Sequence, residues 1–588
     1  MASYIARCLR VVVVIAALGA TAGSAAAVPG PAGLQARVSS TAADTAAARD
    51  ASNPALAANT KANESLAVWQ ADAVGADNKY EIWARRVSLA GTPLGVAVRV
   101  STTGLDTDPT RDATDPQVAY DAQSNEYLVV WQANPPSAGG KVEIFAQRLS
   151  ALGALVGAPI PVSTTGAPGD TTRGAARPVV AYDTKVDEYL VVWSADGLAL
   201  DNKFEVFAQR LSGAGTTLGG VMQVSSTGSP GSASRDAYNP AVDYSPELDQ
   251  YLVAWEADGL SLDNKFEIFA QPVAGGGAPT GAAARISTTG SDLDATRDAF
   301  SPAVSHGSNP AEYLVAWRAD SLGVDNKFEV FAERVGGAGA PNASAIRISR
   351  TGSDTDATQS ALKPALAYNP LGNEFLASWR ADTVLGGSKF EVFVSRIAAD
   401  GTVLDANVQM SHTGLATDPF RDAFNGAIAY HPASNDFLVA WWADGLALDN
   451  KFEIFARRFV GGILPGVTPP ATVDTTAPIV GVRVLPGQRV LRARALRVRI
   501  SCNEPCFATA RGWVFIKKKP TRFITNRVTR QITPPKPVTV RLVLSRRAVI
   551  SIRRALSNHR RVTIRVTVVA TDLANNSRKV RVFFRITR

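Results

Sequence analysis

A repeat of 62 residues constrains the fold of this chain more than any other feature. Seven tryptophans recur at this interval, and so do seven lysines that each have a glutamate two residues later. The repeated residues are Trp69, Trp131, Trp193, Trp255, Trp317, Trp379 and Trp441, and Lys79, Lys141, Lys203, Lys265, Lys327, Lys389 and Lys451. A fixed period of this length is typical of stacked or circular repeat architectures.

Each copy of the repeat contains four short segments with the composition of β-strands. In one copy these are Pro240–Tyr244, Tyr251–Trp255, Lys265–Ala270 and Arg285–Gly290. The stretches between them are rich in Gly, Asp, Asn and Pro, which favour turns. The pattern predicts an all-β protein containing a seven-bladed β-propeller, with a β-solenoid as the competing architecture.

The two ends of the repeat favour the propeller. The seventh copy has its first three strands, but no Ser-Thr-Thr-Gly segment follows Phe455. The segment Arg37–Thr41 lies 62 residues before Arg99–Thr103, so it occupies the position of a fourth strand. An N-terminal strand that completes the last blade closes the ring and removes an exposed edge. We therefore expect the seven-bladed propeller over residues 37–460.

The recurring aromatic and charged residues of the repeat have structural explanations. We expect the tryptophans to fill the core between neighbouring blades, because both faces of most strands are buried there. A hypothesis for the glutamate of the Lys-x-Glu pair is an ion pair with the arginine of the Arg-Asp-Ala turn. These arginines are Arg111, Arg173, Arg235, Arg297 and Arg421.

The first 27 residues have the pattern of a secretory signal peptide. Arg7 and Arg10 precede the apolar run Val11–Leu18, and small residues lead to Ala27. We expect cleavage near that alanine, export of the protein to the exterior or the cell envelope, and no transmembrane anchor after removal of the signal. Export places the remaining cysteines, Cys502 and Cys506, in an oxidising compartment, where they are candidates for a local disulfide.

Charge divides the chain into two regions. Residues 480–588 hold 27 Lys and Arg against 2 Asp and Glu, a net charge of +25, whereas the first 479 residues hold 34 against 50, a net charge of −16. A Pro- and Gly-rich linker is expected at 461–475. A basic, immunoglobulin-like β-sandwich is expected at 476–588, because segments such as Leu496–Cys502 alternate apolar and polar residues.

Both regions resemble parts of secreted bacterial proteins. Asp474–Pro478, Ser501–Cys506 and Ala570–Asn576 are similar to segments of bacterial immunoglobulin-like modules. The repeat, through segments such as Glu126–Trp131 and Phe207–Arg210, resembles uncharacterised propeller repeats of secreted bacterial proteins. These resemblances imply display at the cell surface and binding, and they imply no reaction.

Acidic and amide residues recur in the loop between the second and third strands of the repeat. Oxygen ligands on a flexible loop suit Ca²⁺, and calcium is the one cofactor that the sequence suggests; the competing interpretation is the capping of turns by these side chains. The candidate calcium ligands are Asp72, Asp77, Asp196, Asp201, Asn202, Asp258, Asp263, Asn264, Asp320, Asp325, Asp444 and Asp449. We expect these loops and the connections between blades to lie on one acidic face of the propeller.

No catalytic residue is assigned from the sequence, because near-identical blades argue against an asymmetric catalytic group. We therefore predict a secreted, non-enzymatic binding or scaffold protein. Its propeller would present an acidic recognition face, and its basic C-terminal domain would associate with an anionic envelope surface. The expected partner is an anionic cell-wall polymer or glycan, or else a protein, and no specific nucleic acid. The alternative is an extracellular polysaccharide-acting hydrolase with its site at the propeller channel mouth, because paired carboxyl groups hydrolyse glycosidic bonds.

Overall fold

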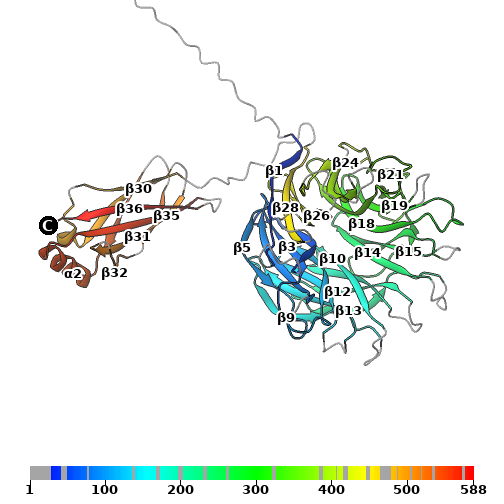
Figure 1. Cartoon of the computed structure of the whole chain (residues 1–588), viewed down its shortest axis with the longest axis horizontal. Helices are drawn as coiled ribbons and strands as arrows, with labels where there is room; N and C mark the ends of the chain where they lie inside the picture. Colours follow the sequence, from blue (N-terminus) through cyan, green and yellow to red (C-terminus); the bar gives the residue numbers. More distant parts are fainter. Residues whose placement is uncertain are drawn as a thin grey trace, which may run out of the picture. The chain divides into compact units, whose positions relative to one another are not determined.

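The chain divides into two compact units, Met1–Pro470 (unit 1) and Ala471–Arg588 (unit 2) (Figure 1). The computed structural model describes residues 28–41, 49–75, 78–135, 140–166, 173–196, 203–228, 235–259, 264–320, 326–382, 389–405, 407–414, 421–444, 451–463, 479–486, 488–502, 506–517, 519–526, 528–532, 537–572 and 577–587. Among these, no helix is both long enough and apolar enough to cross a membrane.

Unit 1 consists of four-stranded antiparallel sheets, of which its described residues contain seven. The first three are β2 (Ala51–Asn59), β3 (Glu64–Ala71), β4 (Glu81–Ser88) and β5 (Pro93–Arg99); β6 (Ala113–Asp121), β7 (Glu126–Ala133), β8 (Glu143–Ser150) and β9 (Leu155–Pro161); and β10 (Ala175–Asp183), β11 (Glu188–Ala195), β12 (Glu205–Ser212) and β13 (Thr217–Gln223). The next three are β14 (Ala237–Ser245), β15 (Gln250–Ala257), β16 (Glu267–Ala274) and β17 (Ala284–Arg285); β18 (Ala299–Ser308), β19 (Ala311–Ala319), β20 (Glu329–Val335) and β21 (Ile346–Arg347); and β22 (Ala361–Asn369), β23 (Glu374–Asp382), β24 (Phe390–Ala398) and β25 (Val408–Gln409). The last sheet is β26 (Ala423–His431), β27 (Asp436–Ala443), β28 (Glu453–Val460) and β1 (Gly30–Arg37). The predicted all-β fold with four-stranded repeat units is confirmed.

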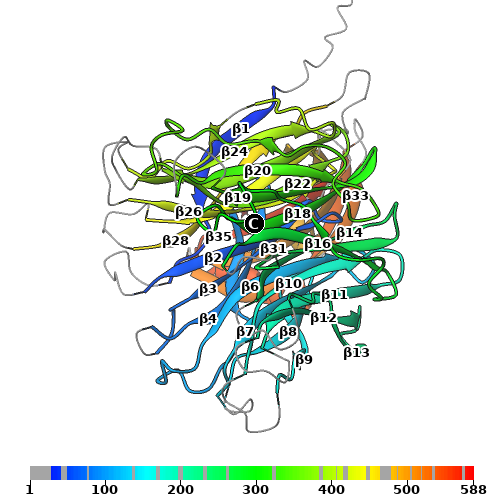
Figure 2. The ribbon, with the colours of Figure 1, turned by 90° about the vertical axis from the view of Figure 1, so that its right-hand side faces the viewer.

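The sheets are arranged around a centre, as in a β-propeller. Their first strands contact one another in a closed cycle, β2 with β6, β6 with β10, and so on to β26, which contacts β2. Figure 2 shows these first strands near the centre of unit 1 and the outer strands β9 and β13 at its edge. Side chains of the seven first strands therefore converge at the centre.

The N-terminal strand completes the last sheet. β1 is antiparallel to β28, and the two lie side by side in Figure 1. The strand lies just before the segment Arg37–Thr41 in which the repeat register placed it. That segment continues the contact, because Val38 N donates a hydrogen bond of 2.7 Å to Ile454 O. The strand β1 and the three strands of the last repeat thus form one sheet.

The tryptophans of the repeat lie in the core, as predicted. All seven are at most 3 % exposed. Trp131, for example, stacks on Phe145 of the neighbouring strand, with ring centroids 6.3 Å apart. Their recurrence is explained by packing between sheets and needs no ligand.

The hypothesis for the glutamate of the Lys-x-Glu pair is wrong. In the first sheet Glu81 Oε1 lies 3.0 Å from Lys79 Nζ and 2.9 Å from Arg99 Nη2, all within one repeat. The lysine also donates a hydrogen bond to the carbonyl oxygen of Arg111, so Arg111 contacts the Lys-x-Glu pair with its backbone and not with its guanidinium group. The arginines of the turn bind loop aspartates instead, as Arg235 Nη1 does at 3.1 Å from Asp258 Oδ1.

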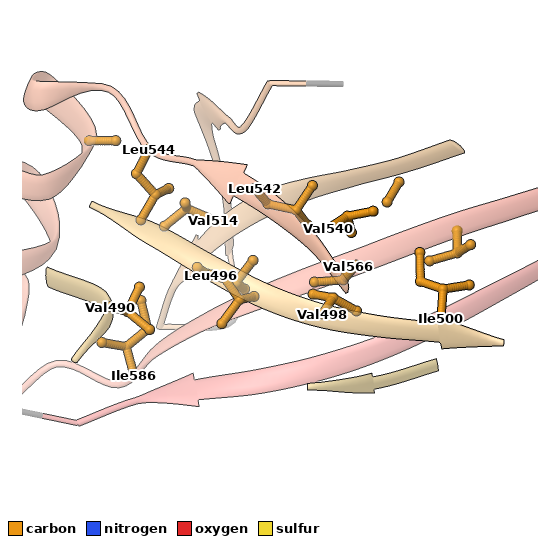
Figure 3. Close-up of a cluster of buried hydrophobic side chains, with 14 of the residues drawn as sticks. Val490, Leu496, Val498, Ile500, Val514, Val540, Leu542, Leu544, Val566 and Ile586 are labelled. Atoms are coloured by element: carbon orange, nitrogen blue, oxygen red, sulfur yellow. The ribbon is translucent and has the colours of Figure 1, made fainter. Parts of the chain in front are cut away.

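Unit 2 contains two sheets and two helices. One sheet is β29 (Val480–Val484), β30 (Ala495–Cys502) and β34 (Val538–Val543); the other is β32 (Lys519–Ile524), β31 (Cys506–Ile516), β35 (Val562–Asp572) and β36 (Ser577–Ile586), with β33 (Val528–Ile532) also paired to β31. The helices are α1 (Val490–Ala493) and α2 (Arg546–Ser557). Figure 3 shows the apolar core, to which both sheets contribute, for example Val498, Leu542 and Val566.

Helix α2 was not predicted from the alternating pattern of unit 2. It buries Ala548, Val549, Ile552 and Ala555, a spacing that places them on one face of a helix. Ser545 caps it, since its side chain accepts a hydrogen bond from Ala548 N. Elsewhere in this unit Cys502 is disulfide-bonded; the side chain of Cys506, its predicted partner, lies outside the described part of the chain.

Candidate functional site

Every first strand of unit 1 contains a β-bulge at the same position of the repeat. The ladder with the second strand shifts there, as between Ser52 and Ala55 in β2. The residue at the bulge has a positive φ, between 48° and 57°, in all seven sheets. These residues, here called the bulge ring, are Asn53, Asp115, Arg177, Asn239, Ser301, Lys363 and Asn425. A left-handed backbone at a residue other than glycine costs about 1–3 kcal/mol, and bulges often re-aim a side chain at a site.

The bulge ring surrounds a cavity of about 710 Å³ at the centre of the sheets, which we call the channel cavity. All seven ring residues line it, together with residues that follow them in the first strands. Arg318 from β19 lines it as well. The ring lies close to the start of each first strand, on the side where the loops between second and third strands leave the sheet. The cavity therefore lies at the channel mouth on that side.

A second set of residues supports the ring from the adjacent strand. Each follows a core tryptophan: Gln70, Gln132, Ser194, Glu256, Arg318, Arg380 and Trp442. In three sheets a side-chain oxygen of this set accepts the backbone N–H of the next bulge residue. These bonds are Asp115 N to Gln70 Oε1 at 2.9 Å, Arg177 N to Gln132 Oε1 at 2.8 Å and Ser301 N to Glu256 Oε2 at 2.6 Å. The acceptors hold the strained bulges in place.

Arg318 and Arg380 occupy the same position in two other sheets and cannot accept a hydrogen bond. Their guanidinium groups lie between aromatic rings. Arg318 is 5.2 Å from the ring centre of Phe300 and 5.1 Å from that of Phe328, and Arg380 has the same arrangement with its own pair of phenylalanines. Among the described residues, the buried Nε atoms of both arginines have no hydrogen-bond partner. Burial lowers the pKa of both side chains.

One carboxyl group lines the cavity, and a second lies behind its wall, hydrogen-bonded to two lining residues. Asp115 lines the cavity, and burial raises its pKa, although Lys363 and Arg177 oppose the rise. Glu256 is 6 % exposed, and burial raises its pKa against the hydrogen bonds that it accepts and the charge of Arg177. Its Oε1 accepts a bond of 2.5 Å from Asn239 Nδ2. The positive charge of Arg177 thus acts on both carboxyl groups.

The predicted calcium ligands are only partly within the described structure. Asp77, Asp201, Asn202, Asp263, Asp325 and Asp449 lie outside the described residues. The first aspartates of the loops, Asp72, Asp196, Asp258, Asp320 and Asp444, are buried, with at most 1 % exposure. Asp258 shows their role: it binds Arg235, and its Oδ2 accepts a bond of 2.6 Å from Asn264 N. The described residues contain no group of three or more His, Cys, Asp or Glu side chains placed to hold a metal, and calcium binding stays a prediction.

These buried aspartates do not contribute to the acidic recognition face expected from the loops. Asp72, Asp258 and Asp320 each form an ion pair with an arginine, at 2.8, 3.1 and 3.1 Å. Their charge is neutralised inside the loop and is not presented to a partner. The expectation was based on the number of acidic residues in the loops. It did not take account of the arginines that form ion pairs with them.

Comparison with known proteins gives no family model and no curated protein that matches the chain. Solved structures that match include a GH93 α-L-arabinofuranosidase of Fusarium graminearum in complex with arabinobiose, with 13 % identity, coverage of 62 % of this chain and 98 % of that chain, and a TM-score of 0.39. An α-L-arabinanase of Penicillium chrysogenum complexed with arabinobiose matches with 11 % identity, coverage of 59 % and 92 %, and a TM-score of 0.37. An α-L-arabinofuranosidase of Lactobacillus brevis matches with 11 % identity, coverage of 51 % and 96 %, and a TM-score of 0.31.

The prediction of a non-enzymatic binding or scaffold protein is contradicted by these neighbours, which are glycoside hydrolases and agree with the alternative interpretation. Identities this low concern the fold alone, and the activities named for those proteins are theirs. The prediction was wrong in its premise that the blades are near-identical. At the bulge ring the seven sheets present amides, a hydroxyl, a carboxylate and two cations, which is the asymmetry that a catalytic site needs.

The bulge ring was missed because its residues are 62 positions apart and differ in charge and side-chain type. A signal was present, since six of them precede a proline of the repeat, as Asp115 precedes Pro116 and Lys363 precedes Pro364. The bulge residue differs between the copies, whereas the residue after it is proline in six of the seven. Such variation beside a nearly constant position indicates that the sheets differ in role there. Comparison of the copies at each repeat position would have exposed it.

Proposed function

We propose that the chain is a polysaccharide-acting hydrolase with its site at the channel cavity. The observation that supports this most is the pair Asp115, which lines the cavity, and Glu256, which is hydrogen-bonded to two lining residues; burial raises the pKa of both. Hydrolysis of a glycosidic bond uses two carboxyl groups, one of which donates a proton to the leaving oxygen. A raised pKa keeps such a donor protonated closer to neutral pH.

The surroundings of the two groups support different roles. Asp115 lines the cavity beside Lys363 and Arg177, whose charges favour its ionised form, so we assign it the role of base or nucleophile. Glu256 is the more buried group, and we assign it the role of proton donor. Its partners Asn239 and Ser301 both line the cavity, which puts the carboxyl group at the cavity wall.

The test is the release of reducing ends from a panel of extracellular polysaccharides by the purified chain. The variants Asp115→Asn and Glu256→Gln are expected to lower kcat by about a hundredfold or more, the usual effect of losing an acid–base group. Asp106→Asn, which removes an exposed carboxylate from a loop, is the matched control and is expected to keep full activity. Release that persists in both carboxyl variants, or no release from any polysaccharide by the folded chain, would refute the proposal.

We also propose the finer architecture behind this site. The closed cycle of contacts supports seven blades over residues 37–460, and the two sheets of unit 2 support an immunoglobulin-like module at 476–588 after a linker at 461–475. The pattern of residues 1–27 supports export, which would bring the enzyme to extracellular polysaccharides.

A further inference from the structure

Basic side chains outnumber acidic ones among the described residues at the channel cavity. Of the described residues that line it, Arg177, Arg318 and Lys363 are basic and Asp115 is acidic, and Glu256 behind the wall adds a second carboxyl group, so the cations exceed the carboxyl groups by one. The first 479 residues of the chain have a net charge of −16. Cations gathered at the centre of an otherwise acidic unit are therefore not a consequence of its average composition.

The basic side chains also act on one another. The pKa of Lys363 is lowered by burial first and then by the charges of Arg380, Arg177 and Arg318, with Asp115 acting in the opposite direction. A cluster of like charges destabilises the empty site, and an anion that enters it relieves the repulsion. The cavity is thus electrostatically suited to an anionic group.

Arg318 shows that this charge is not needed for the fold. The equivalent residues Gln70 and Gln132 accept the backbone N–H of the following bulge residue, a bond that arginine cannot provide. Arg318 gives up this bond, and its guanidinium is held between Phe300 and Phe328 at the cavity wall. A planar guanidinium fixed in this way is suited to bind two oxygens of a carboxylate or sulfate at once.

We propose that the channel cavity binds a negatively charged sugar unit, whose carboxylate or sulfate oxygens contact Arg318, Lys363 and Arg177. That this unit belongs to the substrate rests on the hydrolase proposed above; the binding itself does not. The acidic group is held at the cationic part of the wall, and the adjoining glycosidic bond then lies near Asp115.

Two substitutions remove the charge with little risk to the fold. Arg318→Gln installs the residue that two other sheets have at this position, where its side chain accepts the backbone N–H of the next bulge residue. Lys363→Gln changes a side chain that solvent reaches inside the cavity and that is not part of the packed core. Lys61→Gln is the matched control, because Lys61 lies in the turn at the opposite end of its strand pair and loses the same charge.

The experiment is isothermal titration calorimetry of the full chain at low ionic strength with three probes: an oligogalacturonate, a sulfated dextran oligosaccharide and a neutral arabino-oligosaccharide. We expect one of the two acidic probes to bind, which distinguishes carboxylate from sulfate. Its Kd should rise at least tenfold in Arg318→Gln and in Lys363→Gln and stay unchanged in Lys61→Gln. Equal binding of the neutral probe, no binding of either acidic probe, or Kd values that do not change in the two cavity variants would overturn the inference.

A parallel measurement of reducing ends separates the two proposals. Binding of an acidic probe without release of reducing ends supports the inference and counts against the hydrolase. Release from a neutral glycan by a chain that binds no acidic probe supports the hydrolase and overturns the inference.

Discussion

Arg99 provides a direct test of which charged residues of the repeat stabilise the fold. Its Nη2 lies 2.9 Å from Glu81 Oε1 and 2.7 Å from Asp106 Oδ1, so one guanidinium binds two carboxylates at similar distances. The side chain of Glu81 is fully buried, whereas that of Asp106 is 46 % exposed. The variants Glu81→Gln and Asp106→Asn therefore remove the same charge from the same arginine in different surroundings.

The expected magnitudes differ severalfold. Glu81 also holds the fully buried Lys79 at 3.0 Å and accepts a bond of 2.7 Å from Thr103 N. Removing one partner of a buried ion pair costs about 3–5 kcal/mol, because the other charge is left without compensation. An exposed pair contributes about 0–1 kcal/mol, since water and salt screen it. We expect Glu81→Gln to fall near the lower limit of its range, because Lys79 keeps its carbonyl acceptors Thr103 O and Arg111 O.

The assay is urea unfolding followed by tryptophan fluorescence, with hydrogen exchange to locate the loss. Glu81→Gln should lower the free energy of unfolding and speed exchange in β4, whereas Asp106→Asn should leave both nearly unchanged. Equal losses in the two variants, or a loss below about 1 kcal/mol in Glu81→Gln, would refute the argument that burial decides the contribution of these pairs.

Three further predictions concern other parts of the chain. Burial lowers the pKa of His431 to about 4 from 6.5. The folded state then binds fewer protons than the unfolded state, so the free energy of unfolding is highest above pH 6.5 and falls by about 3 kcal/mol as the pH decreases towards 4. In His431→Gln, the urea midpoint should no longer show this dependence on pH. Ser545→Ala removes the cap of α2 and should cost about 1 kcal/mol, measured by thermal unfolding, while Ser557→Ala at the other end of the helix serves as its control. Glu453→Ala removes the acceptor of Thr41 N at 2.9 Å and of Arg37 Nη2 at 2.7 Å, and the N-terminal strand should then be cleaved faster at an unchanged protease concentration.

The repeat made much of the fold predictable, because a period of strand segments and turns translates directly into sheets. The last sheet was predicted correctly in composition, yet its outer strand β1 lies before the segment Arg37–Thr41. The residues from Val38 onward instead supply Ser39 and Thr41 to the buried carboxylate of Glu453. Helix α2 escaped prediction for a related reason: its apolar residues follow a helical period within a region where every neighbouring segment alternates.

The site was not predictable by the same reasoning, since a period reports what the copies share and function depends on where they differ. In a ring of sheets, residues at one repeat position meet at the centre, so Asp115 and Lys363 interact although several copies separate them in the sequence. The repeated backbone bulge presents one side chain from each sheet to the same cavity. Each ring position can therefore change its chemistry without changing the bulge, as Asn53, Asp115 and Lys363 show with nearly equal φ values of 49°, 51° and 52°. An asymmetric set of charges can arise in this way within a symmetric framework, and the conclusion that similar blades exclude catalysis does not hold for this architecture.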